Sequence, residues 1–264
     1  MKSPNRSNLC NDSDRRLYSH DMSEWHNPDS ASFSALAYKK RVDLILNAVK
    51  RFGATCKILD CGCAQGNISL LLAELGYCVV AMDLRLDFLK YALRKYEKGG
   101  LFPLCASAKE LAFKRNSFEI IIMSEVIEHL AYPLEFLSML KGYLREGGML
   151  ILSTPNGKHF QNKLPCFGDV HDWGPLLERE CGPDGTEHLF LFSKKELATV
   201  LYKAGYTVYS HVLYNTFLIT GRSFGFRRWG KMFPLFWRSA IERLLLRSGL
   251  GDFLAEGQFL IATI

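Results

Sequence analysis

The chain has 264 residues and lacks several features that would assign it to a specialised class of protein. It contains no uncharged apolar run approaching the ~20 residues that a membrane-spanning helix requires. Its first residues, MKSPNRSNLCNDSDRR, are polar and contain no apolar core, so we expect no secretory signal peptide. No internal repeat is visible. These absences favour an ordinary globular protein.

The charge of the chain is also modest. It has 33 Lys and Arg against 27 Asp and Glu, a net charge of +6, and 48% of its residues are apolar. A domain that binds nucleic acid often carries a much more basic, clustered set of Lys and Arg, so we do not expect a nucleic-acid partner. The apolar fraction is sufficient for a sizeable core, and the length fits one large α/β domain with insertions.

The eight cysteines do not form a redox or zinc motif. Cys61 and Cys63 are separated by one residue, whereas such motifs use the CxxC spacing. Most of the cysteines fall in or beside predicted strands, where a free cysteine behaves as a small buried apolar residue. We therefore expect reduced thiols and a cytoplasmic protein, with membrane association left open. The eight are Cys10, Cys56, Cys61, Cys63, Cys78, Cys105, Cys166 and Cys181.

Helix and strand patterns alternate along most of the chain. This alternation predicts βαβ units, a doubly wound and mainly parallel sheet covered on both faces, and a ligand site at the carboxyl ends of the strands. Ser193 and Glu196 predict a capping box at one helix start. Helices are expected over 34–51, 67–75, 86–98, 133–145 and 193–205. Strands are expected over 56–62, 78–84, 101–107, 118–125, 149–156, 206–214 and 258–264.

The domain organisation follows from this pattern. The Ser-, Asn- and Asp-rich segment 1–33 is predicted to be flexible, and 34–264 is predicted to form one domain. Two stretches, 157–192 and 215–257, interrupt the alternation and are predicted to be insertions. Insertions beyond strand ends are where substrate lids form, so we expect the first to be a substrate cap or else a plain surface loop.

A glycine-rich turn joins the first predicted strand to the following helix in ILDCGCAQGN. Gly62 and Gly66 permit a tight turn and the close approach of a ligand, although a plain βα connection can look the same. Asp60 precedes the turn, and Asp83 ends the next strand, where an acidic residue can hold a ribose diol. A carboxylate beside the turn would repel the pyrophosphate of a dinucleotide but attract an aminoacyl sulfonium.

Taken together, these segments resemble the class I S-adenosylmethionine-dependent methyltransferases over roughly 56–264. ILDCGCAQGN resembles motif I of that family and AMDL its second motif, while FEIIIMSEVIEHL and LREGGMLILSTPN resemble the motifs of the fourth and fifth strands. The resemblance implies a Rossmann-like fold with a seven-strand, mainly parallel sheet whose last strand, QFLIATI, is antiparallel.

The resemblance also implies a site for S-adenosyl-L-methionine. Its methionine part would contact Asp60 and the glycine-rich turn, its ribose hydroxyls would bind Asp83, and its adenine would touch Leu84. The family usually has an acidic residue after the third strand, where this chain has Ser107 and Ala108 instead. The expected cofactor-binding residues are Arg41, Asp60, Gly62, Cys63, Gly66, Asp83, Leu84, Ser107, Ala108 and Glu125.

Glu125, Glu128 and His129 follow the fourth predicted strand. A helical turn starting at Glu125 would place the three side chains on one face, where they could bind Mg²⁺, Mn²⁺ or Zn²⁺ beside the cofactor's methyl group. A metal there could lower the pKa of a substrate hydroxyl. The alternative is a site without metal, in which Glu125 lines the cofactor pocket and His129 is a general base or a polar wall residue.

The ExxEH segment resembles two groups, the ubiquinone-biosynthesis O-methyltransferases and the small-RNA 2′-O-methyltransferases. Both resemblances imply a divalent metal, with His188 in TEHLFLFS as the best match for a further ligand. The first resemblance extends upstream and implies that Arg41 reaches the cofactor's carboxylate; a solvated helix position is the alternative.

The segment 222–247 is basic and aromatic. It has seven Arg or Lys and one acid, Glu242, interleaved with six Phe and Trp residues. A helix from Pro234 onward could lie in a membrane interface, cap a lipid-linked substrate, or pack in the core with a solvated basic edge. Its apolar side would hold Phe236, Trp237, Ala240, Ile241, Leu244 and Leu245, flanked by Arg238, Arg243 and Arg247.

The predicted reaction is transfer of the sulfonium methyl to an acceptor oxygen on a small-molecule or lipid- or glycan-linked substrate. Alignment of the two reactants would supply most of the catalysis, and deprotonation by His129 with Glu128, or by a metal, the rest. An RNA 2′-O-methyltransferase and a non-catalytic cofactor-binding interaction protein are the alternatives. A NAD-dependent dehydrogenase is disfavoured because the pyrophosphate motif is missing.

Overall fold

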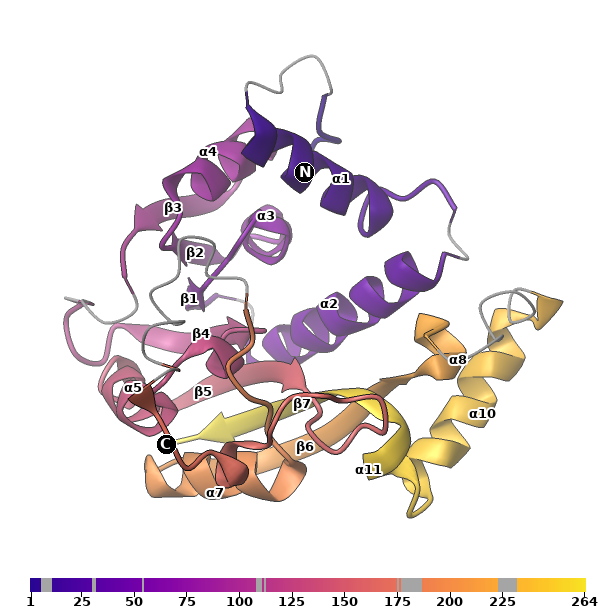
Figure 1. Cartoon of the computed structure of the whole chain (residues 1–264). Helices are drawn as coiled ribbons and strands as arrows, with labels where there is room; N and C mark the ends of the chain where they lie inside the picture. The colour runs from indigo at the N-terminus through magenta and orange to yellow at the C-terminus, as the bar shows by residue number, and fades with distance from the viewer. Residues whose placement is uncertain are drawn as a thin grey trace. The chain divides into compact units, whose positions relative to one another are not determined.

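The structure is a computed structural model that describes residues 1–5, 11–29, 32–53, 55–107, 111, 113–174, 176, 187–222 and 232–264 (Figure 1). The chain forms two compact units. The first contains Met1–Met123 and Gly142–Ile151, and the second contains Ser124–Lys141 and Leu152–Ile264. The division falls inside the segment 34–264, for which the sequence predicted one domain.

The first unit is built from parallel βαβ units. Strand β1 pairs with β2 and with β4, so that Asp60 lies beside Ala81 on one side and Ile122 on the other. The chain runs from β1 to β2 and β3 on one side of β1 and then places β4 on the other side. The strand order therefore reverses at β1, and α/β folds bind ligands at the carboxyl ends of strands at such a point. The elements are α1 (Asp12–Ser23), α2 (Phe33–Phe52), β1 (Lys57–Cys61), α3 (Asn67–Glu74), β2 (Cys78–Asp83), α4 (Leu86–Lys95), β3 (Gly100–Cys105), β4 (Phe118–Ser124) and the first part of β5 (Leu144–Pro155).

The second unit ends in an antiparallel pair, β6 and β7, in which Leu213 lies opposite Gln258. The predicted capping box begins α7: Ser193 Oγ accepts a hydrogen bond from the Glu196 backbone at 3.3 Å, and the Glu196 carboxylate accepts one from the Ser193 backbone at 2.7 Å. The elements are η3 (Ile127–His129), α5 (Pro133–Lys141), the end of β5, η4 (Phe167–Asp169), α7 (Lys194–Lys203), β6 (Thr207–Thr216), α8 (Phe217–Thr220), α10 (Leu235–Arg247), α11 (Gly251–Leu254) and β7 (Ala255–Thr263).

The strand order of the sheet is β3-β2-β1-β4-β5-β7-β6. This confirms the predicted α/β fold, with seven strands and an antiparallel last strand. The central strands are apolar on both faces, and Ile120 to Met123 of β4 are fully buried. No helix in the described part of the chain is both long enough and apolar enough to span a membrane.

The N-terminal segment differs from its prediction. Helix α1 occupies Asp12–Ser23 inside the segment 1–33 that was predicted to be flexible. Its Ser-, Asn- and Asp-rich composition supplies a helix cap, because the Asn11 side chain accepts a hydrogen bond from the Asp14 backbone at 2.7 Å. Leu17 and Asp21 are buried and attach the helix to the unit.

The predicted helix after Pro234 is α10, and one of its three flanking arginines differs from the prediction. Arg238 was expected on a solvated flank and is buried instead, together with Glu242, while Phe236 and Trp237 are exposed. The buried pair makes hydrogen bonds to backbone groups of β6 and α8, which explains why this side of the helix faces inward. Residues 223–231, with Phe224, Phe226 and Trp229, lie outside the described residues.

Candidate functional site

The glycine-rich turn between β1 and α3 is fixed by its backbone. Gly62, Ala64 and Gly66 all have positive φ angles, of 79°, 47° and 74°. The backbone N–H groups of Gly62 and Cys63 both donate to the Met82 carbonyl at 2.8 Å, which fastens the turn to β2. A turn in this left-handed region favours glycine, as the sequence pattern predicted.

Gly66 is also fixed by packing against α4. A Cβ atom at this position would lie 2.7 Å from Cβ of Ala92, closer than two such atoms can approach. The glycine therefore lets α3 and α4 approach each other at the first turn of α3. This is the close helix packing for which the last glycine of such loops is used.

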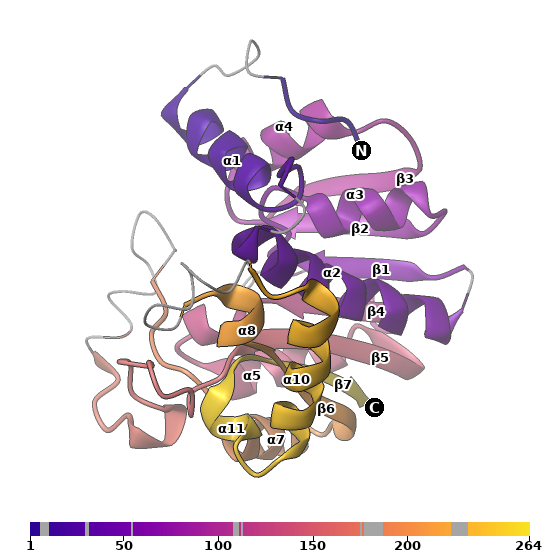
Figure 2. The same ribbon diagram turned by 90° about the vertical axis from the view of Figure 1, so that its right-hand side faces the viewer.

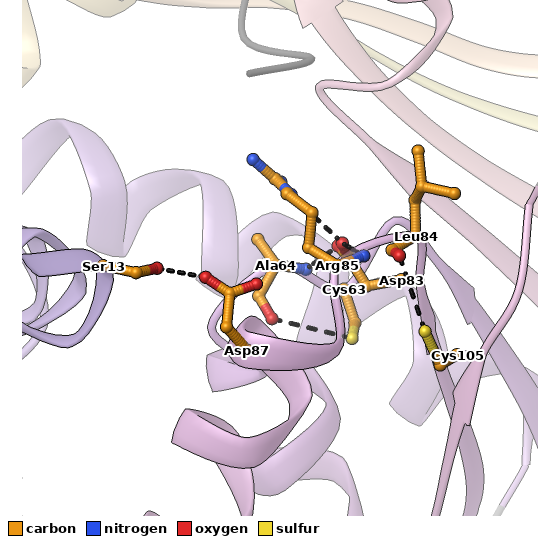
Figure 3. A network of polar contacts seen from close by, with 8 residues as sticks. All are labelled: Ser13, Cys63, Ala64, Asp83, Leu84, Arg85, Asp87 and Cys105. Atoms are coloured by element: carbon orange, nitrogen blue, oxygen red, sulfur yellow. Dashed lines mark hydrogen bonds and ion pairs between the residues drawn. The ribbon is translucent and has the colours of Figure 1, made fainter. Parts of the chain in front are cut away.

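Asp83 lies at the end of β2 and bonds to the turn (Figure 3). Its Oδ2 accepts a hydrogen bond from the Ala64 backbone at 2.8 Å, and its Oδ1 accepts hydrogen bonds from the Arg85 backbone at 3.0 Å and from Arg85 Nε at 3.3 Å. The carboxylate is therefore held in a fixed orientation by the turn on one side and by Arg85 on the other.

The residues expected near adenine lie at the ends of β2 and β3. Leu84 is exposed directly after Asp83, and its carbonyl accepts a weak hydrogen bond from Cys105 Sγ at 3.5 Å. Ser107 follows two residues after β3 ends at Cys105. The predicted contact of Ala108 lies outside the described residues, as do Cys10 and Cys181.

Asp60 is buried at the end of β1 and accepts a hydrogen bond from Ser69 Oγ of α3 at 2.5 Å. The pKa of Asp60 is raised from 3.8 to about 6, mainly by burial; the Ser69 hydrogen bond lowers it and the nearby charge of Asp83 raises it. Burial also raises the pKa of the Cys63 thiol. The two neighbouring carboxyl groups of Asp60 and Asp83 make this end of the sheet attractive to a cation.

A buried polar network next to the turn was not predicted from the sequence. Lys95 Nζ donates to Asp21 at 2.6 Å and to the Asn67 side chain at 2.5 Å, and Asn67 in turn donates to Asp21 at 2.8 Å. Asn67 is the first residue of α3, so the network fixes the start of that helix. The only sequence signal was the position of Asn67 directly after Gly66.

Arg41 is connected to this network through Tyr38. Its guanidinium lies over the Tyr38 ring at 5.2 Å from the centroid, and the Tyr38 hydroxyl accepts a hydrogen bond from Asn67 at 3.1 Å. Helix α2 thus brings Arg41 into the neighbourhood of the first turn of α3. Its predicted role as a ligand of a carboxylate remains a prediction.

In the second unit, the structure brings together three of the predicted ligands. The ligand atoms of Glu128, His129 and His188 lie within 4.8 Å of one another. His129 Nδ1 is 2.8 Å from the Glu187 carbonyl, which orients the ring, and Thr154 donates to the buried Glu128 carboxylate at 2.9 Å. Burial lowers the pKa of His188, which favours the neutral ring that binds metals.

Glu125 is not one of the three residues whose ligand atoms lie within 4.8 Å of one another, although its charge acts on His188. The helical turn begins only at Ile127, and Glu125 itself has a positive φ of 57°, so the assumed spacing on one face was wrong. The Glu125 carboxylate accepts a hydrogen bond from Ser153 Oγ at 3.1 Å instead. Two nitrogen ligands and one carboxylate still fit Zn²⁺ or Mn²⁺, which accept both ligand types.

The insertion 157–192 is described at its two ends, and it forms an aromatic cluster there. The rings of Phe167 and Phe192 stack at 5.0 Å, and Trp173 meets the edge of Phe167 at 5.5 Å.

In the part of the chain that the structure describes, every cysteine is a free thiol.

Comparison with known proteins places the chain among methyltransferases. The model of a family described as "Methyltransferase domain" matches residues 30–211. The ubiquinone biosynthesis O-methyltransferase of Parvibaculum lavamentivorans is 33% identical over 132 residues, which are 49% of this chain and 52% of that protein. The chain therefore spans about half the length of the curated relatives it matches.

Solved structures support the fold. An S-adenosylmethionine-dependent methyltransferase from Mesorhizobium loti superposes with a TM-score of 0.56 at 16% identity, over 83% of this chain and 96% of that one. A putative sarcosine dimethylglycine methyltransferase from Galdieria sulphuraria gives a TM-score of 0.57 at 13% identity, over 96% and 98% of the two chains. At these identities, the similarity shows the fold alone.

Proposed function

The chain belongs to the methyltransferase domain family and has the fold of class I S-adenosylmethionine-dependent methyltransferases, and from this premise we propose that it transfers the methyl group of S-adenosyl-L-methionine to an acceptor oxygen. The observation that carries the proposal is the pairing of the Gly62–Gly66 turn with Asp83 at the end of β2. A small acceptor or a lipid-linked one would meet the cofactor's sulfonium, which supplies the methyl group.

The proposed cofactor contacts follow from the positions of these residues. Asp83 would accept hydrogen bonds from the two ribose hydroxyls, and the exposed Leu84 would cover adenine. The backbone of the turn would contact the methionine part, and Arg41 would bind its carboxylate. Two carboxyl groups, Asp60 and Asp83, suit a cofactor with a sulfonium and an ammonium group, whereas they would repel a pyrophosphate.

We propose that His129 removes the proton of the acceptor hydroxyl. Nδ1 lies 2.8 Å from the Glu187 carbonyl and would donate a hydrogen bond there, which leaves Nε2 as the nitrogen that accepts the proton. A general base of this kind contributes typically about 10²–10⁴-fold to a rate.

The donor set of Glu128, His129 and His188 also fits a divalent metal. As the alternative to a base at His129, these three residues would hold the ion, with His129 as a ligand, and the ion would lower the pKa of the acceptor hydroxyl as a Lewis acid. The names of the relatives, which refer to O-methylation in ubiquinone biosynthesis, support an oxygen acceptor and make catechols and diols the first compounds to test.

The free thiols support a reducing, cytosol-like compartment.

The test is calorimetric titration with S-adenosylhomocysteine, with and without EDTA and added Zn²⁺ or Mg²⁺. Wild type should bind in the micromolar range, and Asp83→Asn should lose at least about tenfold in affinity because hydrogen bonds to a charged acceptor are lost. Asp87→Asn is the matched control, since Asp87 bonds to Ser13 of α1 and lies outside the proposed contacts. Absence of binding in wild type, or equal affinity in Asp83→Asn, would contradict the proposal.

A further inference from the structure

Helix α10 is attached to the second unit by polar side chains. Arg238 and Glu242 are 2% and 1% exposed, one helical turn apart on the same face. Arg238 Nε donates to the Leu218 carbonyl of α8 at 2.7 Å, and the Glu242 carboxylate accepts a hydrogen bond from the Thr216 backbone at the end of β6 at 2.8 Å. These two contacts determine which side of α10 faces inward.

The opposite side of α10 is apolar and exposed. Phe236, Trp237 and Leu244 are 69%, 59% and 70% exposed, and the side chain of Phe233 just before the helix is exposed as well. Trp237, Ile241 and Leu244 are four and three positions apart and therefore share one face of the helix. We define the α10 apolar face as Met232, Phe233, Phe236, Trp237, Ile241 and Leu244.

Figure 2 shows α10 on the side of the second unit that is turned towards the viewer, with α8 and α11 beside it. A surface helix ordinarily turns its apolar stripe towards the core and its charges towards water. Here the pattern is reversed, and a run of large exposed apolar side chains of this kind marks an interaction site.

We propose that the α10 apolar face binds the surface of membranes that contain anionic lipids. Arg243 and Arg247 are exposed on the same helix, whereas its acidic residue, Glu242, is turned inward. An interfacial helix binds in this way, with Trp, Phe and Leu entering the acyl boundary and arginines meeting the lipid phosphates. The 13 residues of α10 span only about 20 Å, so the helix would lie in the interface rather than cross it.

The charges disfavour a second copy of the chain as the occupant. A two-fold contact through this face would bring Arg243 and Arg247 near the same residues of the partner molecule. No acidic side chain of α10 is exposed among its described residues, and the neighbouring α11 adds one exposed carboxylate, Asp252, against two exposed arginines of α10 in each copy. Lipid phosphates supply the missing negative charge. Binding of α10 to a membrane surface does not require methyl transfer.

The test is co-sedimentation of the full chain with vesicles of phosphatidylcholine alone and of phosphatidylcholine mixed with phosphatidylglycerol. Wild type should bind the anionic vesicles and not the neutral ones, and added salt should weaken binding. Trp237→Ser combined with Leu244→Ser should reduce partitioning at least about tenfold. Replacing Arg243 and Arg247 by Ala should cost roughly fivefold for each residue.

Tyr209→Ser is the matched control, because Tyr209 is an exposed aromatic residue on β6 away from α10. It should bind like wild type. A second measurement is independent of variant stability: brominated phospholipids should quench tryptophan fluorescence in wild type, and less so in Trp237→Phe, which keeps an apolar side chain. Equal binding to neutral vesicles, unchanged binding in the serine variant, or concentration-dependent dimers that need Trp237 would overturn the proposal.

Discussion

The two parts of the candidate site are built in different ways. The cofactor turn and Asp83 come from one continuous stretch, and backbone hydrogen bonds and positive φ angles fix their geometry. The cluster of Glu128, His129 and His188 depends instead on side chains from two segments that are about sixty residues apart. The first arrangement can be recognised from local spacing, whereas the second forms only when folding brings two distant segments of the chain together. We expect the two parts to fail differently when they are mutated.

The largest effect is expected from His129→Ala. Turnover should fall about 10²–10⁴-fold because the proposed base is lost, while the affinity for S-adenosylhomocysteine should stay unchanged. Steady-state kinetics and calorimetry measure the two quantities. His20→Ala, an exposed histidine on α1, should change neither. If cofactor affinity fell together with turnover, the two parts would not be separate in function.

Gly66→Ala tests whether the cofactor turn is fixed by backbone and packing together. The substitution should lower the free energy of unfolding by about 1–2 kcal/mol through strain at a positive φ and by a further ~1–3 kcal/mol through a clash with Ala92. Gly76→Ala separates the two terms, because Gly76 also has a positive φ but has no atom within 4 Å of the added Cβ. Urea denaturation should show the larger loss for Gly66→Ala; equal losses would remove packing as a cause.

A smaller and pH-dependent effect is expected from Asp60→Asn. The folded pKa of Asp60, about 6, lies above its usual 3.8, so the protonated carboxyl stabilises the fold at low pH and this stabilisation is lost as the pH rises through 6. The amide cannot ionise. The free energy of unfolding of the variant Asp60→Asn, relative to that of wild type, should therefore rise by up to about 3 kcal/mol between pH 4 and pH 7. Denaturation at several pH values measures this, and a constant difference would contradict it.

The sheet was largely predictable because apolar strands and periodic helices alternate. The bounds of β1, β2 and β4 agree with the sequence to within a residue or two. Strand β5 begins at Leu144, five residues before its predicted start, because Gly147-Gly148 indicated a loop but belongs to the strand. The two glycines indicated the end of a strand by their low strand propensity, but the pairing with neighbouring strands that extends β5 across them is not visible in the sequence.

Three local details differ from the predictions. Helix α1 was missed because its polar composition indicated disorder. Arg238 was expected on a solvated flank of α10, whereas its hydrogen bond to the Leu218 carbonyl holds it in a buried position. The helical spacing assumed from Glu125 onward fails because this residue has a left-handed conformation. The long-range hydrogen bond of Arg238 is not contained in any local pattern.

Helix α1 also determines how the chain would respond to proteolysis. Asp21 supplies the counter-charge for Lys95, whose pKa is lowered by burial beside Asn67. A cut between α1 and α2 that released the helix would leave an ammonium group in the core without a carboxylate, and such a group either loses its proton or admits water. Cleavage far from the glycine-rich turn would thereby loosen the start of α3. Residues 24–32 contain no Lys or Arg, so resistance of this junction to chymotrypsin, which cuts after Trp25, would report on whether the turn is assembled.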